Sequence, residues 1–289
     1  MAIPKKTDDA IVVSQIEMSE MKFNMVGITP LMPHSPSAHA KGQLLFPAPK
    51  KNAAERATSM KHEPFDEYRD AAYLFSDAEV GPVRMYMPAS AIKAALRDVA
   101  IDMIGAKKAQ IGRLTAVVGF KLPLYGVPKM NTMMVRSSDM NRTPDIRTLP
   151  CLERWAIPNV RVRFVSLIKA QSMPNLMANA GIIIGIGDGR PQHGYFDFGT
   201  WRLAEDNDRE LREIMATGGR KAQEKALADP EFYDLETEKL ISWFMAEQKK
   251  RAAAPPPPAK RRAATTPAMT PPPKGNGRGR PKKETRLSS

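Results

Sequence analysis

The nine residues "VRVRFVSLI" at 160–168 are the clearest guide to the fold, because apolar and charged side chains alternate along them. Val160, Val162 and Phe164 fall on one side of an extended chain, and Arg161 and Arg163 fall on the other. A strand with one apolar and one charged face packs one face on a core and leaves the other in water. The segment therefore predicts a half-buried strand.

The segments around this strand predict alternating strands and helices. A helix is indicated where apolar residues recur at helical spacing after Pro88, with Ser90 as a candidate cap. In chain order we expect a strand at 21–29, a helix at 89–104, one or two strands at 114–126 divided at Pro123, the strand at 160–168, a helix at 174–187 and a strand at 195–204. This order is the split βαβ pattern, so the predicted class is α+β with a ferredoxin-like βαββαβ core.

Two long segments interrupt that core, and three helices follow it. Residues 31–64 and 127–150 predict long loops or insertions without a core element, and 65–76 predicts either a short helix or an extended segment. Helices are expected at about 206–217, 220–228 and 231–248. In the last of them the apolar residues fall close to one stripe: Phe232, Leu235, Leu240, Trp243 and Phe244.

Composition divides the chain into four parts. We expect a flexible N-terminus at 1–19, a body at 20–204 with insertions at 31–64 and 127–150, a helical C-terminal part at 205–250, and a disordered tail at 251–289. The tail has no aromatic residue and is rich in Pro, Ala, Thr, Lys and Arg, so it cannot bury enough apolar area to fold alone.

The net charge of +13 is concentrated at one end of the chain. Residues 249–289 contain 12 Lys or Arg and one acidic residue, which leaves 32 basic and 30 acidic residues in 1–248. A nearly neutral body excludes a uniformly basic nucleic-acid binder, and the attraction to a polyanion lies in the tail.

Cysteine content and the N-terminal segment indicate a reducing compartment. Cys151 is the single cysteine, so an internal disulfide is excluded, and we expect it to be a small buried residue. The N-terminal segment lacks the apolar core of a signal peptide. We expect a cytoplasmic protein of a bacterial host cell, nucleoid-associated when bound to DNA, with no cofactor, no metal and no membrane partner.

The tail carries a motif, "GRGRPKK" at 277–283, that resembles an AT-hook. The A·T minor groove is narrow and electronegative and attracts inserted arginines such as Arg278 and Arg280. Gly279 has no side chain to strike the groove wall, and Pro281 restricts the chain to an extended path. Lys282 and Lys283 can reach flanking phosphates. The motif predicts binding to A·T-rich duplex DNA in the minor groove.

The body contains a glycine-rich segment, "GIIIGIGDGRPQHGYFDFGTWRL" at 181–203. Its spacing is G-x-G-x-G and no helix is expected after the glycines, which argues against a dinucleotide-binding loop. It resembles the glycine-rich loop of the RAMP superfamily, the ferredoxin-like RNA-binding subunits of CRISPR effector complexes. "MYMPASAIKAALRDVA" at 85–100 and "GITPLMPHS" at 27–35 are similar to two further blocks of that family. These blocks also resemble stand-alone phage and prophage relatives of the CRISPR backbone subunit.

The resemblance covers about residues 20–204 and implies a body that holds single-stranded DNA or RNA along its backbone, as a homo-oligomer or filament. The candidate contacts it implies are Ser90, Lys93, Arg97, Arg136, Arg142, Arg161, Arg163, Gly187, Gly189 and Arg190. For Met133, Met134 and Trp201 we expect buried packing, and the alternative is that they wedge between bases or stack on them.

Two alternatives stay open beside a non-enzymatic nucleic-acid-binding protein. The first is a RAMP-type ribonuclease that uses a histidine as general base, with His34 and His39 as candidates in the early loop. For His193 in the glycine-rich segment we expect a phosphate contact. The second is an oligomeric scaffold in which only the tail binds DNA.

Overall fold

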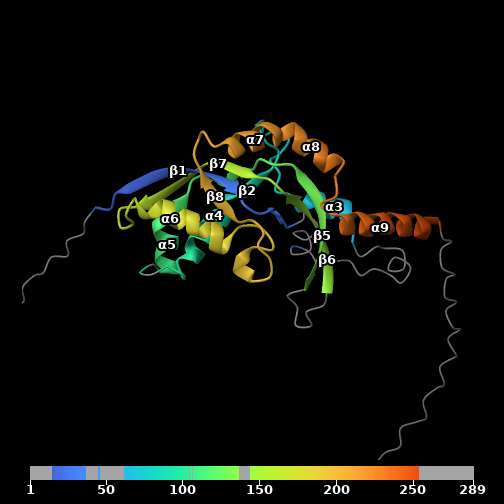
Figure 1. Ribbon diagram of the computed structural model, residues 1–289, viewed down its shortest axis with the longest axis horizontal. Coiled ribbons are helices and arrows are strands. Elements are labelled where there is room, and N and C mark those ends of the chain that lie inside the picture. Colours follow the sequence, from blue (N-terminus) through green and yellow to red (C-terminus); the bar gives the residue numbers. More distant parts are fainter. Residues whose placement is uncertain are drawn as a thin grey trace, which may run out of the picture. The chain divides into compact units, whose positions relative to one another are not determined.

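The computed structural model describes residues 15–36, 45, 62–103, 105, 107–136 and 144–253. The chain divides into two units at Ala253–Ala254, and the structural description below concerns the first (Figure 1). The predictions for 1–14, for most of 31–64 and for the tail from 254 onward, including its AT-hook, lie outside the described residues. No helix within the described segments is long and apolar enough to cross a membrane.

A four-stranded antiparallel sheet forms the centre of the structure. Its strands are β1 (Met18–Gly27), β3 (Thr115–Val117), β7 (Ala156–Val165) and β8 (Trp201–Ala204), in the order β3-β7-β1-β8. β7 lies between β3 and β1 and pairs antiparallel with both. Residues 160–165 of the predicted strand are thus part of an interior strand, and residues 166–168 form a turn after it.

The alternation predicted for β7 is confirmed. Val160, Val162 and Phe164 are buried in the main core, whereas Arg161 and Arg163 are exposed. The apolar face of the strand therefore fixes which side of the sheet the helices cover.

Three helices cover the apolar face: α4 (Ala89–Val99), α5 (Lys108–Leu114) and α6 (Ser172–Asn179), the last continued by a π-helical turn at Ala180–Ile184 (Figure 1). Ile92 and Leu96 of α4 are completely buried in the same core as Phe164. The predicted cap is wrong, because α4 begins at Ala89 with Pro88 as its cap residue and Ser90 lies inside the helix. The predicted helix at 174–187 ends at Ile184, since Gly185 leaves the helix with φ of +69°.

Two helices lie on the opposite face, α7 (Arg209–Thr217) and α8 (Arg220–Ala228) (Figure 1). Leu211 and Ile214 of α7 pack on Val26 of β1 and Ala156 of β7 in a second apolar cluster. The protein is thus a mixed α/β structure with helices on both faces of an antiparallel sheet.

The predicted loop at 127–150 is wrong. This segment forms a hairpin of β5 (Pro128–Arg136) and β6 (Pro144–Leu152), which pair antiparallel along their whole length. α3 (Pro64–Asp70) packs on β6, and α9 (Leu235–Ala253) packs on β5. Helices from distant parts of the chain bury Met130 and Leu149 of the hairpin. The apolar residues of the hairpin do not alternate regularly with polar ones, so the sequence pattern did not indicate strands.

Four smaller predictions are also corrected. The segment at 114–126 contributes to two sheets, since β3 is followed by a bend at 118–120 and then by β4 (Lys121–Pro123), which pairs with β2 (Tyr86–Pro88). The last strand begins at Trp201, not 195. Leu31 and Met32 are completely buried although 31–64 was expected to hold no core element. The stripe expected on α9 is broken, because Leu235 and Trp243 are exposed while Ile241 is buried.

Gln223 of α8 is a buried polar side chain that joins α8 to the rest of the structure. Its Oε1 accepts hydrogen bonds from the backbone N–H groups of Arg84 (2.7 Å) and Met85 (2.9 Å). Its Nε2 donates to three backbone carbonyls, those of Leu124 (2.8 Å), Gly126 (3.0 Å) and Gly218 (3.1 Å). The amide thus satisfies backbone groups that the small strands leave unpaired.

Candidate nucleic-acid interface

The glycine-rich segment forms a loop at 185–200 whose base is fixed by backbone hydrogen bonds. Ile186 N–H donates to Gly199 O (3.0 Å), Gly199 N–H donates to Pro30 O (2.7 Å), and Asp188 N–H donates to Met32 O (2.8 Å). The base of the loop is therefore tied to the segment that follows β1, two regions that the sequence places far apart.

Gly187, a predicted contact residue, has a structural reason to be glycine. Its φ is +82°, and a Cβ at this position would lie 2.6 Å from Met32 O. Both the left-handed backbone and the close approach exclude a side chain. Gly189 lies two residues further along the same loop.

A hydrogen-bonded chain of side chains connects this loop to α4. Arg190 Nε donates to Gln192 Oε1 (2.9 Å), and Gln192 Nε2 donates to Asp98 Oδ2 (2.7 Å). The other oxygen of Asp98 binds Arg97 Nε (2.8 Å) and Lys108 Nζ (3.0 Å). The structure thus brings together two predicted residues, Arg97 and Arg190, around a carboxylate that the sequence did not single out.

Asp98 is an almost buried carboxylate at the centre of these cations. Burial alone would raise the pKa of Asp98, but the hydrogen bonds from Arg97, Lys108 and Gln192 outweigh burial and hold that pKa well below its usual range. Asp98 is therefore ionised at neutral pH and holds the ends of Arg97 and Lys108 at the surface.

Ser90, Lys93 and Arg97 lie on one exposed face of α4. Their spacing of three and four residues puts them on neighbouring turns of the helix, and all three are exposed. Ile92 and Leu96 take the opposite face into the core, which fixes the orientation of the charged face. The predicted α4 residues and Arg190 therefore form one surface, which we call the α4–loop surface: Ser90, Lys93, Arg97, Lys108 and Arg190.

His34 lies beside the same loop and has a carboxylate partner. Its Nδ1 is 3.1 Å from Asp188 Oδ2, which also accepts a hydrogen bond from Arg147 Nη1 (3.2 Å). The hydrogen bond from His34 is the main cause that lowers the pKa of Asp188, to about 2, against the opposing effect of burial. His193 lies in the exposed tip of the loop, and His39 lies outside the described residues.

The two arginines of β7 belong to a different surface. Arg161 and Arg163 both pair with Glu20 of β1, at 3.4 Å and 2.8 Å, on the face of the sheet opposite to α4. They therefore do not share a groove with Arg97 and Arg190. Their charge is also partly balanced by the carboxylate between them.

The remaining predicted residues are spread over the hairpin and the core. Arg136 is the last residue of β5, and Arg142 lies outside the described residues. Met134 is 74% exposed and Met133 is half-buried, so the hairpin presents methionine to solvent. Trp201 is completely buried, which confirms the packing expected for it and excludes the stacking of a base on its ring.

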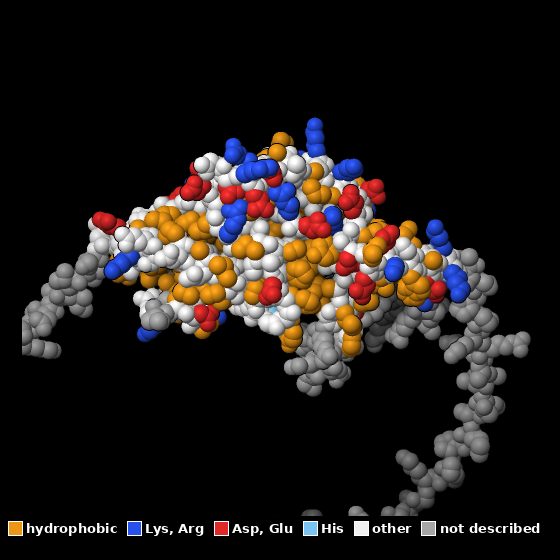
Figure 2. All heavy atoms as spheres, in the orientation of Figure 1, with side chains coloured by type: hydrophobic (Ala, Val, Ile, Leu, Met, Phe, Trp, Pro, Cys, Tyr) orange, Lys and Arg blue, Asp and Glu red, His pale blue; other side chains and the backbone are white. Residues whose placement is uncertain are grey.

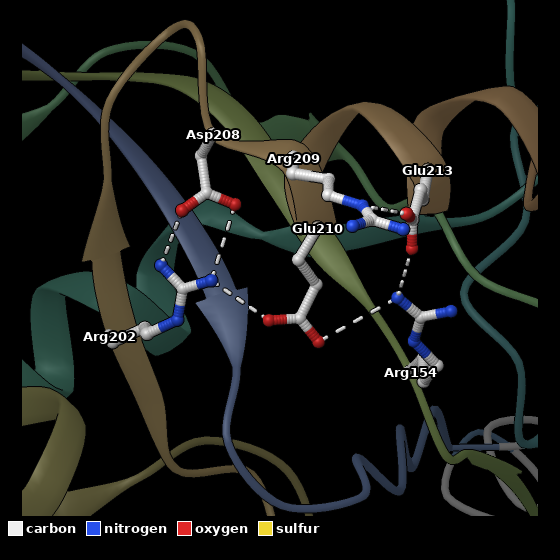
Figure 3. A pocket seen from close by; sticks show the side chains of 6 residues that line it. All are labelled: Arg154, Arg202, Asp208, Arg209, Glu210 and Glu213. Carbon is white, nitrogen blue, oxygen red and sulfur yellow. Dashed lines mark hydrogen bonds and ion pairs between the residues drawn. The ribbon is translucent and has the colours of Figure 1, made fainter.

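A charged depression lies between α7 and the sheet, and its charges are paired (Figure 3). Arg202 of β8 binds Asp208 (2.8 Å) and Glu210 (2.8 Å), and Arg154 binds Glu213 (3.2 Å). Figure 2 shows the same mixture of basic and acidic side chains over α7 and α8. The network holds α7 against the sheet. The lining of the depression has three arginines and three carboxylates and so leaves no excess charge for a ligand: Arg154, Arg202, Arg209, Asp208, Glu210 and Glu213.

Asp208→Ala is expected to lower the free energy of unfolding by about 1 kcal/mol, because Asp208 caps α7 by accepting a hydrogen bond from Leu211 N–H (3.0 Å). The hydrogen bond from Arg202 is the main cause that lowers the pKa of Asp208 to about 2. A carboxylate with a lowered pKa stabilises the fold above its unfolded value of about 4 and loses that effect as pH falls. Urea unfolding of both proteins from pH 7 to pH 2 should show the difference shrinking below pH 4. A difference independent of pH would contradict a role for the ionised carboxylate.

In the described segments no group of His, Cys, Asp or Glu side chains is arranged to hold a metal ion. Cys151 is buried and free, as predicted, and burial raises the pKa of its thiol to about 12. Its sulfur is therefore a thiol at neutral pH.

Sequence reasoning missed Asp98, Lys108, Gln192, Asp188 and Arg147. Lys108 and Gln192 carry no local signal, since each belongs to the site through its contact with Asp98, which lies on a different element of the fold. Asp98 follows Arg97 directly and interrupts the buried face of α4, so its position on that face was the available signal.

Comparisons with known proteins give distant likeness to solved structures and nothing nearer. No family model matches this chain, and no curated protein matches it. Among the solved structures it is similar to a chain from the type III-B Cmr-beta complex bound to cognate target RNA, determined by cryo-EM. The identity is 13%, the TM-score is 0.28, and the alignment covers 64% of this chain and 60% of the other. A likeness of this strength carries no functional inference.

Proposed function

We propose that this protein binds nucleic acid without cleaving it, holding a single strand on the α4–loop surface and A·T-rich duplex DNA with its tail. The observation that carries the proposal is the convergence of Lys93, Arg97, Lys108 and Arg190 from two helices and one anchored loop. Asp98 is the carboxylate among them, and it already binds Arg97, Lys108 and Gln192. The surface therefore keeps a positive excess that favours phosphates.

The arrangement of the sheet supports a ferredoxin-like, RAMP-like body as part of this proposal. The strand order β3-β7-β1-β8, all antiparallel, with α4 following β1 and α6 following β7, is the order that a βαββαβ chain gives. The resemblance noted in the sequence implies a palm that contacts the backbone of a strand through its first helix and glycine loop. The α4–loop surface consists of these two elements with their added cation, Lys108.

Replacing Lys93 and Arg97 together with alanine is expected to weaken binding to a single-stranded oligonucleotide. If each cation neutralises one phosphate of the single strand, the slope of log K against log salt should become shallower by about 1.4, at about 0.7 per phosphate. Stability should change little, because Asp98 keeps Lys108 and Gln192 as partners. Fluorescence anisotropy with a labelled oligonucleotide at several salt concentrations measures both the affinity and the slope.

A matched control removes two exposed lysines at the same spacing from another helix. Lys221→Ala with Lys225→Ala on α8 makes the same change in net charge away from the α4–loop surface. If the control changed the slope as much as the α4 variant does, attraction of the oligonucleotide would depend on net charge alone. The assignment of its binding site to the α4–loop surface would then be wrong.

The tail motif predicts a contact with the DNA minor groove, and two substitutions distinguish this contact from attraction by charge alone. Gly279→Val places a branched side chain between the two arginines, and Arg280→Lys keeps the charge but loses the planar guanidinium. Both variants are expected to lose the preference for A·T-rich over G·C-rich duplex, by roughly 1–3 kcal/mol. Salt-sensitive binding through the remaining lysines and arginines should persist. Competition between two duplexes of equal length tests this, and equal affinity of the unaltered chain for both would reduce the motif to a charged tail.

The His34–Asp188 pair favours the ribonuclease as the second candidate. A carboxylate accepts hydrogen bonds only, so Asp188 holds the proton on Nδ1 and leaves Nε2 of a partly exposed ring as a base. RNA that is cleaved by the protein and stays intact with His34→Ala would establish this candidate. RNA that stays intact with the unaltered protein would remove it.

A further inference from the structure

The tip of the glycine-rich loop exposes two aromatic side chains. Residues 192–197 are all exposed, and within them the side chain of Tyr195 is 84% exposed and that of Phe196 is 45% exposed. Large exposed aromatic side chains close together mark a binding surface more often than a random part of the surface. The predicted site residues stop at Arg190 and do not include this pair.

Backbone hydrogen bonds on both sides fix the chain that carries these rings. A short helical turn, Pro191–His193, precedes them, and Gly194 N–H donates to Pro191 O (2.8 Å). After them, Phe198 N–H donates to Gly189 O (3.1 Å). The ring of Phe196 also lies 5.6 Å from the ring of Phe198, at an angle of 30°. The backbone that carries both rings and the ring of Phe196 are thus in place before any ligand arrives, which lowers the entropic cost of binding.

One cation of the α4–loop surface, Arg190, lies on the same loop, and two others, Arg97 and Lys108, lie next to the loop. Arg190 is five residues before Tyr195, and Gln192, in the tip itself, hydrogen-bonds Asp98 beside Arg97 and Lys108. Asp197 is an acid of the tip, and Asp188 of the same loop is paired with Arg147. The local balance is therefore four cations, Arg97, Lys108, Arg147 and Arg190, against Asp98, Asp188 and Asp197. Aromatic faces next to a positive surface are how proteins hold unpaired bases and their phosphates.

We propose that Tyr195 and Phe196 stack on unpaired bases of a single strand whose phosphates lie along Arg97, Lys108 and Arg190. This inference rests on the proposed function and adds a base-contacting element to it. Stacking needs a base whose face is free, so the site takes a single strand and not an intact duplex, and it reads base faces without strong sequence preference.

The experiment compares a single-stranded oligonucleotide with an abasic strand of equal length, using the full chain at one salt concentration. The unaltered protein should bind the base-bearing strand between about fivefold and a hundredfold more tightly, the range given by one stacked base. Tyr195→Ala with Phe196→Leu should abolish that ratio while keeping affinity for the abasic strand. The tail has no aromatic residue, so it does not supply the ratio.

Two further variants make the result specific to the rings. Tyr195→Trp keeps an aromatic face and should keep the ratio. Trp243→Ala removes an exposed aromatic side chain from α9 and should leave the ratio unchanged. Equal affinity of the unaltered chain for both strands would overturn the stacking site and leave the proposed function standing, whereas binding to neither strand would overturn the proposed function itself. A double variant that alters self-association in sedimentation but keeps the ratio would show that the rings contact a second copy, and the inference would be wrong.

Discussion

Gln223→Leu is expected to lower the free energy of unfolding by at least about 3 kcal/mol, because each buried polar group left without a partner costs roughly 1–3 kcal/mol. Leucine has similar volume but removes the amide from two backbone N–H groups and from the carbonyls of Leu124 and Gly126. The carbonyl of Gly218 keeps the hydrogen bond from Gly126 N–H. No water reaches a side chain that is completely buried, so the other groups have little to replace the amide. Chemical unfolding followed by circular dichroism measures the loss.

The control makes the same chemical change on an exposed glutamine. Gln110→Leu on α5 should alter stability by less than about 0.5 kcal/mol, as is usual for the surface. If both variants lowered the free energy of unfolding by the same amount, the hydrogen bonds of Gln223 would not be the cause of the lost stability.

Gly199→Ala is the substitution expected to damage the candidate interface most. Gly199 has φ of +72°, and a Cβ there would overlap the carbonyl of Ile186, whose own N–H donates to Gly199 O. The left-handed backbone alone costs about 1–2 kcal/mol for a residue with a side chain. The overlap adds to that cost, because the hydrogen bonds at the base of the loop must shift. We expect a loss of about 3 kcal/mol in stability and a loss of single-strand affinity together.

Gly194→Ala separates the two causes. Gly194 has nearly the same φ, +71°, but a Cβ there would meet nothing within 4 Å. This variant should cost only the backbone strain, about 1–2 kcal/mol. Hydrogen exchange of the loop amides and melting temperatures of the two variants provide the comparison, and equal destabilisation would show that the overlap at Gly199 is relieved without cost.

The features that the sequence predicts well are those set by local periodicity. The alternation at 160–164 predicts the faces of β7, and the helical spacing of Ile92, Leu96 and Val99 predicts the buried side of α4 and hence its charged side. The hairpin at 128–152 could not be predicted in this way. Its burial comes from α3, α8 and α9, for example through the hydroxyl of Tyr68, which donates to Pro128 O.

The residues of the candidate interface also divide into those that local periodicity predicts and those that only long-range packing reveals. Lys93 and Arg97 follow from one helix face, whereas the bond between Asp98 and Gln192 joins residues 94 positions apart and has no local signature. Arg161 and Arg163 show the reverse case. Their exposure was predicted correctly, but only the pairing of β7 with β1 and the packing of α4 reveal that they lie on the other side of the sheet.

The order of strands in the central sheet has a consequence for how the chain folds. β1 at 18–27 pairs with β7 at 156–165 and with β8 at 201–204, so neither of its neighbours exists until more than a hundred residues have been synthesised after it. Closing such long loops makes folding slow, on the scale of about milliseconds to seconds for sheets of non-local pairing. Until β7 emerges from the ribosome, both edges of β1 and the apolar side chains of Phe23, Met25 and Val26 stay open to other chains. Nascent chains that stall before Ala204 should therefore depend on chaperones to avoid aggregation, and completed chains should not.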